Sequence, residues 1–217
     1  MLGLKINNNR RLKVLCLGAH SDDIEIGCGG TILSLLGKYR TAEVNWVVFS
    51  SEAGREEEAR TGADTFLKHA GRKNVRIEKF RNGFFPYIGS EIKEYFEAMK
   101  EDVSPDVIFT HYREDLHQDH RVISELTSNS FRDHLILEYE IPKWDGDIGR
   151  PNMFMPLQDS VCRKKISNIL SIFKTQASKH WFKEDLFYSI LRIRGMECLS
   201  PTNHAEAYYC RKWVLDL

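Results

Sequence analysis

The sequence predicts an α/β fold, a Rossmann-like three-layer arrangement with a mostly parallel twisted sheet and helices on both faces. Two observations predict it. Short aliphatic or β-branched runs alternate with longer segments of helical period through the first two thirds of the chain, as in parallel strands joined by helices. The first run is followed by a polar, glycine-rich turn and an apolar helix. We expect one domain, residues 1–217, since this length is near the upper range for a compact domain.

The elements follow in order from these patterns. Strands are expected at residues 12–17, 44–49, 75–80, 106–110 and 135–139. Apolar side chains at intervals of three and four predict helices near residues 59–70, 92–99 and 162–173. Residues 140–157 contain three prolines and two glycines, which predicts a long loop without regular structure. A late strand is expected within residues 207–214.

Composition and charge favour a small-molecule partner. The 31 basic residues balance the 31 acidic ones, so no net charge draws the chain to nucleic acid or an anionic membrane. The five scattered cysteines form no C-x-x-C pair, which argues against a disulfide framework or a thiolate zinc site and favours a reducing cytoplasm. Residues 1–11 lack the apolar core of a signal peptide, and no apolar run is long enough for a membrane span. A homo-oligomer is left open.

The segment AHSDDIEIGCGG, residues 19–30, is the first candidate site. It follows a buried strand and therefore lies at the carboxyl edge of the sheet, where open α/β folds bind ligands. Its three acids would repel a phosphate, so the turn is expected to bind a cation. His20 and Asp23 can converge on one metal with the N/O donors that suit zinc, which leaves Asp22 free beside it. The alternative is that the aspartates only cap the next helix.

The segment THYREDLHQDHRV, residues 110–122, follows the fourth strand and should lie on the same edge. His117 and His120 are three residues apart at an apparent helix start, on one face of that helix. A catalytic zinc site takes three protein ligands and leaves a fourth position open. His20, Asp23 and one of these two histidines would supply the three.

Together the two motifs resemble those of the PIG-L or LmbE-like family of zinc-dependent de-N-acetylases, A-H-P-D-D-E and D-x-H-x-D-H. The matching segments here are residues 19–23 and 115–120, with Ser21 and Gln118 where proline is common. The resemblance implies a Zn²⁺ cofactor with these ligands: His20, Asp23 and His120. It also implies that Asp22 is the general base and that His117 acts as acid or oxyanion stabiliser.

This chemistry would hydrolyse an amide. Zinc lowers the pKa of its bound water from ~16 toward ~7, so Asp22 can remove a proton as the water attacks the carbonyl. Asp119 is expected to orient an imidazole, or else to be a surface acid at a helix start. By the resemblance, Arg55 and Asn82 contact substrate; the alternatives are a solvated loop cation and a turn residue. Four aromatic residues are candidates for stacking on a sugar: Phe84, Phe85, Tyr87 and Trp144.

The leading hypothesis is a deacetylase that removes an N-acetyl group from an amino sugar, whether free, nucleotide-linked or glycosidic. Two alternatives remain open. One is a zinc amidohydrolase that acts on a non-sugar N-acyl substrate. The other is a nucleotide-binding module without catalysis, which only the glycine-rich turn supports, and which would have no use for a base beside a metal.

Overall fold

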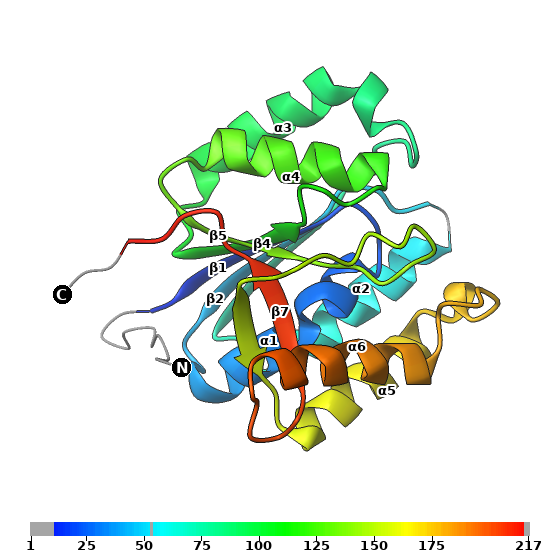
Figure 1. The fold of residues 1–217 in the computed structure, drawn as a ribbon. Coiled ribbons are helices and arrows are strands. Elements are labelled where there is room, and N and C mark those ends of the chain that lie inside the picture. The colour runs from blue at the N-terminus through cyan, green and yellow to red at the C-terminus, as the bar shows by residue number, and fades with distance from the viewer. Residues whose placement is uncertain (1–10, 53, 215–217) are drawn as a thin grey trace.

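The computed structural model describes residues 11–52 and 54–214. Within them lie seven strands: β1 (Lys13–Gly18), β2 (Glu43–Val48), β3 (Arg72–Ile77), β4 (Val107–His111), β5 (Leu135–Tyr139), β6 (Met153–Pro156) and β7 (Ala205–Tyr209). They form one sheet in the order β3-β2-β1-β4-β5-β7-β6 (Figure 1). Strands β1 to β5 pair in parallel, whereas β7 is antiparallel to β5 and β6. The predicted α/β fold with a mostly parallel sheet is confirmed.

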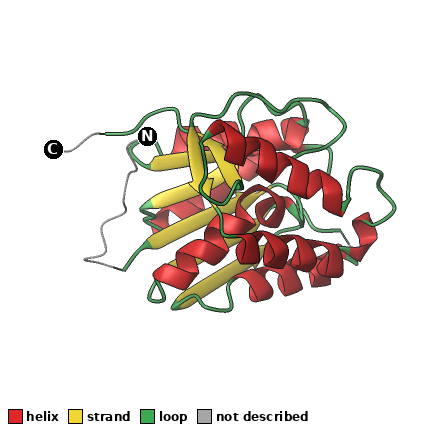
Figure 2. Ribbon diagram, turned by 60° about the horizontal axis from the view of Figure 1, so that its bottom comes forward, coloured by secondary structure: helices red, strands yellow, loops and turns green. Residues whose placement is uncertain are grey.

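Helices cover both faces of the sheet (Figures 1 and 2). On one face lie α3 (Gly89–Asp102) and α4 (Gln118–Ser130). On the other lie α1 (Asp23–Lys38), α2 (Arg55–Phe66), α5 (Asp159–Ile172) and α6 (Glu184–Glu197). Short 3₁₀ turns occupy Phe85–Tyr87 and Lys174–Gln176. None of the helices in the described ranges is long and apolar enough to cross a membrane.

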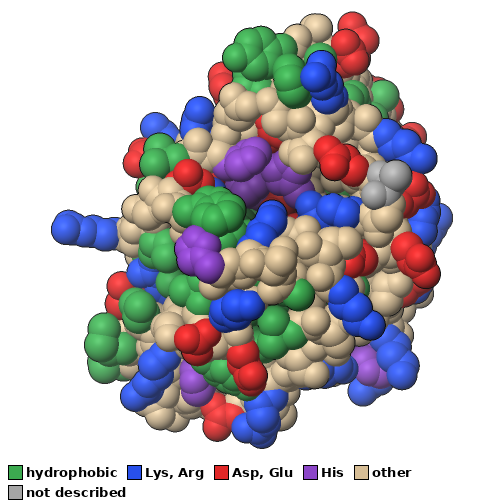
Figure 3. All heavy atoms as spheres, turned by 90° about the vertical axis from the view of Figure 1, so that its right-hand side faces the viewer, with side chains coloured by type: hydrophobic (Ala, Val, Ile, Leu, Met, Phe, Trp, Pro, Cys, Tyr) green, Lys and Arg blue, Asp and Glu red, His purple; other side chains and the backbone are tan. Residues whose placement is uncertain are grey.

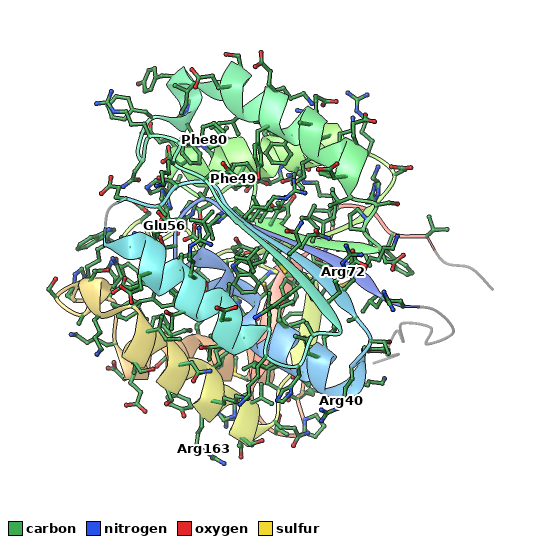
Figure 4. The ribbon with its side chains drawn as sticks, turned by 180° about the vertical axis from the view of Figure 1, so that it is seen from behind. Arg40, Phe49, Glu56, Arg72, Phe80 and Arg163 are labelled. Carbon is green, nitrogen blue, oxygen red and sulfur yellow. The ribbon has the colours of Figure 1, made fainter. Side chains whose placement is uncertain are left out.

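Alternate strand side chains supply two separate cores, because successive residues of a strand point to opposite faces. In β1, Val14 and Cys16 join the cluster beneath α1 and α5, while Leu15 and Leu17 join the cluster beneath α3 and α4. This burial on both faces explains the continuous apolar run in β1. Seen from behind in Figure 4, Phe49 lies beside Phe80 below α3, with ring centroids 6.2 Å apart.

Two parts of the chain differ from the sequence prediction. The prediction of irregular structure throughout residues 140–157 was wrong at its end, where β6 pairs with β7 along the edge of the sheet. Pro156 is tolerated there because the strand is an edge strand. Helix α6 was not predicted at all, although Phe187 and Leu191 bury an apolar stripe. Residues 1–10, most of the segment examined for a signal peptide, lie outside the described residues.

The strand order places one crevice at the carboxyl edge of the sheet. Strand β1 lies between β2 and β4, and the helices that follow β1 and β4 cover opposite faces. The connections that leave β1 and β4 therefore run to opposite faces of the sheet and leave a crevice at the carboxyl ends of these two strands. Doubly wound sheets bind ligands at such a crevice. Both predicted motifs begin at this point, since His20 follows β1 and His117 follows β4.

Candidate metal centre

The first motif forms a tight turn between β1 and α1. The backbone N–H of His20 donates to Asp23 Oδ2 over 2.6 Å, which fixes the Asp23 carboxylate inside the turn. Gly18 enters this turn, and a Cβ atom there would lie 2.9 Å from Ile24, so the chain passes too closely for a side chain. Asp22 occupies the N-cap position of α1 without accepting a capping hydrogen bond. The helix-capping alternative therefore does not explain Asp22.

The second motif forms the start of α4. His117 is the N-cap residue, and its Nδ1 accepts a hydrogen bond of 3.2 Å from the backbone N–H of Asp119. This bond leaves Nε2 of His117 as the nitrogen available to a ligand. His120 lies in the first turn of α4 and is buried. The rings of His117 and His120 stack with centroids 4.6 Å apart.

Three donor atoms of the two motifs converge. His20 Nδ1 lies 3.1 Å from His120 Nε2, and Asp23 Oδ2 lies 3.3 Å from His20 Nδ1 and 3.6 Å from His120 Nε2. A tetrahedral zinc with bonds of ~2.0–2.1 Å separates its ligand atoms by roughly 3.3 Å. The donor types and their spacing therefore fit a zinc ion held by His20, Asp23 and His120.

Carboxylates fix the second nitrogen of each histidine in this triad. His120 Nδ1 lies 2.9 Å from Asp115 Oδ2, and His20 Nε2 lies 3.3 Å from Asp119 Oδ2. Each ring that donates to its carboxylate keeps a lone pair on the nitrogen that faces the triad. Asp119, which was expected to orient an imidazole, also accepts from the backbone of Gly83 at 2.6 Å. Asp115 belongs to the quoted motif but received no role from the sequence.

Burial and neighbouring charges shift the pKa values of the three histidines His20, His117 and His120. Burial alone would lower the pKa of His20, yet Asp23 and Asp119 raise that pKa to about 9. Burial and the neighbouring His111 lower the pKa of His120 to about 3. Burial and His20 also lower the pKa of His117. In the metal-free protein near pH 7, His20 therefore carries a proton and His120 does not.

His111, at the end of β4, is a buried neighbour of the triad; the sequence left open whether it lines the pocket or packs in the core. Its Nε2 lies 2.9 Å from the backbone N–H of Ala19 and 3.2 Å from Asp23 Oδ2. Its ring stacks on His120 with centroids 3.9 Å apart. Asp23, His111 and His120 thus form one further group close enough to hold an ion, and His20, His117 and His120 form another. The hydrogen bond from Ala19 uses the Nε2 lone pair of His111, which argues against His111 as a ligand.

The predicted residues share one cleft of about 170 Å³. Asp22 Oδ1 accepts a hydrogen bond of 2.7 Å from Arg55 Nη2, and Asn82 Nδ2 lies 3.3 Å from Glu52 Oε1 at the rim. Figure 3 shows histidine side chains gathered in this hollow, with lysine or arginine and hydrophobic side chains at its mouth. The lining contains every predicted site residue except Asp119, which lies behind His20.

Of the four aromatic candidates, only Trp144 lines the cleft within the described part of the chain. Phe85 is buried and stacks behind His20, with ring centroids 6.2 Å apart. Phe84 and Tyr87 are exposed beside each other and lie outside the lining. The sequence alone could not distinguish buried from exposed residues here, since Phe84, Phe85 and Tyr87 lie within four consecutive positions.

Comparison with known proteins finds a matching family model, a similar sequence and similar folds. A family model described as GlcNAc-PI de-N-acetylase (PIG-L) matches residues 15–131. The chain is 28% identical over 144 residues to the uncharacterized deacetylase YaiS of Escherichia coli K12, covering 62% of this chain and 76% of YaiS. Its fold is similar to that of the N,N'-diacetylchitobiose deacetylase of Pyrococcus horikoshii, with a TM-score of 0.67, 20% identity, and coverage of 91% and 83% of the two chains.

The same fold also occurs in an enzyme of another reaction class. The 4-carboxy-2-hydroxymuconate hydratase GalB of Pseudomonas putida KT2440 is similar with a TM-score of 0.70 at 16% identity, over 95% of this chain and 98% of that one. The architecture alone therefore does not determine the chemistry, which depends on the residues of the site.

Proposed function

The chain belongs to the PIG-L family of de-N-acetylases, and from this premise we propose that it is a zinc-dependent hydrolase that removes the N-acetyl group of an amino sugar or its glycoside. The observation that carries the proposal is the convergence of His20 Nδ1, Asp23 Oδ2 and His120 Nε2 within 3.6 Å, in a cleft that also contains the carboxylate of Asp22. When bound, zinc would act as a Lewis acid toward the attacking water and the amide carbonyl.

Asp22 is the general base of the proposed reaction. Its Oδ1 accepts a hydrogen bond of 2.7 Å from Arg55 Nη2, and this contact fixes the carboxylate in the cleft. Asp22 takes a proton from water as the water oxygen bonds to the amide carbon. Arg55 therefore positions the base, and its Nε, which has no partner among the described residues, is available to a substrate oxygen.

His117 assists the reaction as a hydrogen-bond donor. Its Nδ1 accepts the N-cap bond, and burial and His20 lower its pKa, which favours the neutral ring with its proton on Nε2. From Nε2 it donates a hydrogen bond to the carbonyl oxygen as negative charge develops there. The carbon–nitrogen bond then breaks as the nitrogen receives the proton that Asp22 took from water. Asn82, with Glu52 beside it, offers a donor and an acceptor to sugar hydroxyls at the rim. The products are acetate and a primary amine.

The test is acetate release by purified protein from a panel of N-acetylhexosamines and their glycosides, with metal analysis of the same sample. We expect about one zinc per chain, loss of activity on chelation and recovery on addition of zinc. Full turnover by metal-free protein would contradict the metal role. If the panel releases no acetate while a non-sugar amide or an unsaturated acid is converted, the amino-sugar assignment is wrong.

A further inference from the structure

The outer face of helix α6 is apolar towards its C-terminal end. Helix α6 packs against β7 and α5 and lies at the outside of its helix layer (Figure 1). Its buried stripe contains Phe187 and Leu191, whereas Ile193, Met196 and Leu199 are 46%, 65% and 84% exposed. Large apolar side chains that gather on one exposed face, rather than scatter singly, mark an interaction surface.

Leu199 also has a backbone conformation that favours glycine. Its φ is 53°, in the left-handed region, and it directly follows Cys198, the residue that ends α6. Glycine is the common residue at this position of a helix end, because a Cβ atom is strained there. Within the described part of the chain this leucine remains exposed, so folding of one copy does not bury its side chain in return.

Two charged residues flank the apolar side chains. Arg192 has no acidic partner within 4.0 Å in residues 11–52 and 54–214, and its Nη1 donates to the carbonyl of Asn203 over 3.2 Å. Glu197 is paired with Arg194 at 2.8 Å, but its side chain is 35% exposed. A carboxylate accepts about four hydrogen bonds, so Glu197 can bind a further donor. The face therefore presents one free cation and one acid with remaining capacity.

These residues are arranged symmetrically about the middle of residues 192–197. Each residue of an α-helix turns by about 100° and rises by about 1.5 Å. Ile193 and Met196 therefore lie about 30° to either side of one radial line, at equal heights below and above the midpoint. Arg192 and Glu197 lie about 70° to either side, again at equal heights. A two-fold axis along this line pairs two antiparallel helices so that each residue faces its counterpart.

A hollow of about 500 Å³ lies beside the N-terminal half of this segment. Its lining consists of Tyr188, Ser189, Arg192, Ile193 and His204. In an antiparallel pair, the N-terminal half of one helix faces the C-terminal half of the other. The hollow of each copy therefore faces the exposed apolar end of the other copy, where Met196 and Leu199 project.

We propose that the outer face of α6 is the interface of a homodimer, in which two copies of this chain pack antiparallel about a two-fold axis. A second copy is the partner that fits, because the face is complementary to itself: Ile193 faces Met196, Arg192 faces Glu197, and the apolar end faces the hollow. A two-fold interface requires such self-complementarity, and each contact then occurs twice. One helix pair is a small interface, so we expect a roughly micromolar Kd.

Sedimentation velocity of the full chain at about 1–100 µM measures this association. We expect the wild type to form dimers as its concentration rises. Met196→Asp should weaken association by at least about tenfold, because the pair would then bury two carboxylates without partners. Tyr87→Asp is the matched control, since Tyr87 is 76% exposed on the loop after β3, and this variant should associate as the wild type does.

Charge reversal tests the antiparallel register. Arg192→Glu and Glu197→Lys should each associate weakly alone, because like charges then meet at both ends of the pair. An equimolar mixture of the two variants should form heterodimers, since each introduced charge then faces its opposite. In Glu197→Lys, Arg194 keeps its pair with Glu140, and circular dichroism checks that both variants are folded.

Three results would overturn the interface. They are a wild-type chain that stays monomeric at about 100 µM, association that is unchanged in Met196→Asp, and a mixture of folded charge-reversal variants that stays monomeric. Dimers in the wild type and in the mixture, but not in either charge variant alone, would support it. Acetate release is measured separately, so a failure of the dimer leaves the deacetylase proposal standing.

Discussion

At the residue scale, the adjacent carboxylates of Asp22 and Asp23 have different partners. Asp23 lies against three histidines, whereas Asp22 lies against Arg55. Asp23→Ala removes one of three proposed ligands, so zinc affinity and activity should both fall steeply. Asp22→Asn keeps the shape but removes the proton acceptor, so zinc should stay bound while turnover drops by roughly 10²–10⁴. The measurement is zinc per chain beside the rate for each variant.

The reverse result would exchange the two assignments. If Asp22→Asn loses zinc while Asp23→Ala retains it, Asp22 is the ligand. If both variants keep wild-type turnover, this turn is not the catalytic centre. Comparable folding of the two variants, checked by circular dichroism, excludes a collapse of the β1–α1 turn as the cause.

Asp115 should control zinc affinity without contacting the ion. Its carboxylate fixes the ring of His120 at 2.9 Å and is itself paired with Lys143 at 3.0 Å. Asp115→Asn weakens the acceptor for His120, so zinc affinity should fall roughly 10–100-fold, the usual effect of such outer carboxylates. Competition with a chromogenic chelator measures it. Glu114→Gln, an exposed neighbour, is the control and should bind zinc as the wild type does.

Zinc affinity should rise with pH because of His20. In the metal-free protein Asp23 and Asp119 outweigh burial and hold the pKa of His20 near 9, so a proton occupies this site at pH 7. Zinc must displace that proton, and its apparent affinity should increase roughly tenfold per pH unit between pH 6 and 8. His120, with a pKa near 3, is already deprotonated there. Calorimetry in two buffers should find about one proton released per zinc, and a pH-independent affinity would refute this.

The proposed metal ligands could be predicted from the sequence because each of the two short motifs contains its donor residues within a few positions of one another. His20 and Asp23 lie three positions apart, and their approach depends only on one turn. The role of Asp115 was not readable, because it depends on how the loop before α4 bends back onto His120. His111 was considered as a pocket-lining or packing residue, but its contact with Asp23 was not predictable, since a strand end gives no indication of which neighbour it contacts.

At the element scale, a buried ion pair supports the helix that carries the first motif. Lys165 of α5 and Glu206 of β7 lie 2.6 Å apart, and both are almost fully buried. Lys165 donates to the carbonyl of Ile26, while Glu206 accepts from the backbone N–H of Gly30 at 2.7 Å. A Cβ atom on Gly30 would lie 2.9 Å from the Glu206 carboxylate, so this contact requires glycine. The pair thus ties α1 to two later elements.

Breaking this pair should destabilise the protein strongly. Glu206→Gln leaves the Lys165 ammonium buried without a carboxylate, which typically costs about 3–5 kcal/mol in the free energy of unfolding. The double variant Glu206→Gln/Lys165→Met also removes the unpaired ammonium and should recover part of the lost free energy of unfolding. Urea denaturation measures both. Lys73→Met, which breaks an exposed pair with Asp64, is the control and should cost at most about 1 kcal/mol. Equal effects of Glu206→Gln and Lys73→Met would show that the buried pair contributes little.

Elements that build the parallel sheet were predictable, whereas those at its antiparallel edge were not. The central strands β1, β2 and β4 are almost entirely buried, and β1 and β4 therefore contain continuous apolar runs. Strand β6 is short, half-buried and ends in Pro156, so its sequence resembles a loop. Only pairing with β7 makes it a strand. Its assignment depends on a contact some fifty residues away, which a local pattern does not contain.

At the scale of the whole molecule, the site depends on the order of the strands more than on any one element. The sequence predicts that both motifs follow parallel strands, and the order β2-β1-β4 then makes those strand ends neighbours. The part of the cleft lined by Trp144 and Lys179 was not predictable in this way. Trp144 and Lys179 come from irregular segments, whose position depends on contacts such as the Arg194–Glu140 pair that holds the loop after β5.

Zinc should stabilise the entire fold, because two of its proposed ligands, His20 and His120, are 100 residues apart in sequence and meet only in the native state. A ligand that binds only the folded chain at 100 times its Kd adds about 2.7 kcal/mol. For a chain of this length, that gain should raise the Tm by roughly 5–10 °C, measured by calorimetry of metal-free protein with and without zinc. In Asp23→Ala the rise should shrink to a small fraction. An equal rise in that variant would mean that zinc binds elsewhere on the surface, and a Tm unchanged by saturating zinc in the wild type would mean that the triad does not hold the ion.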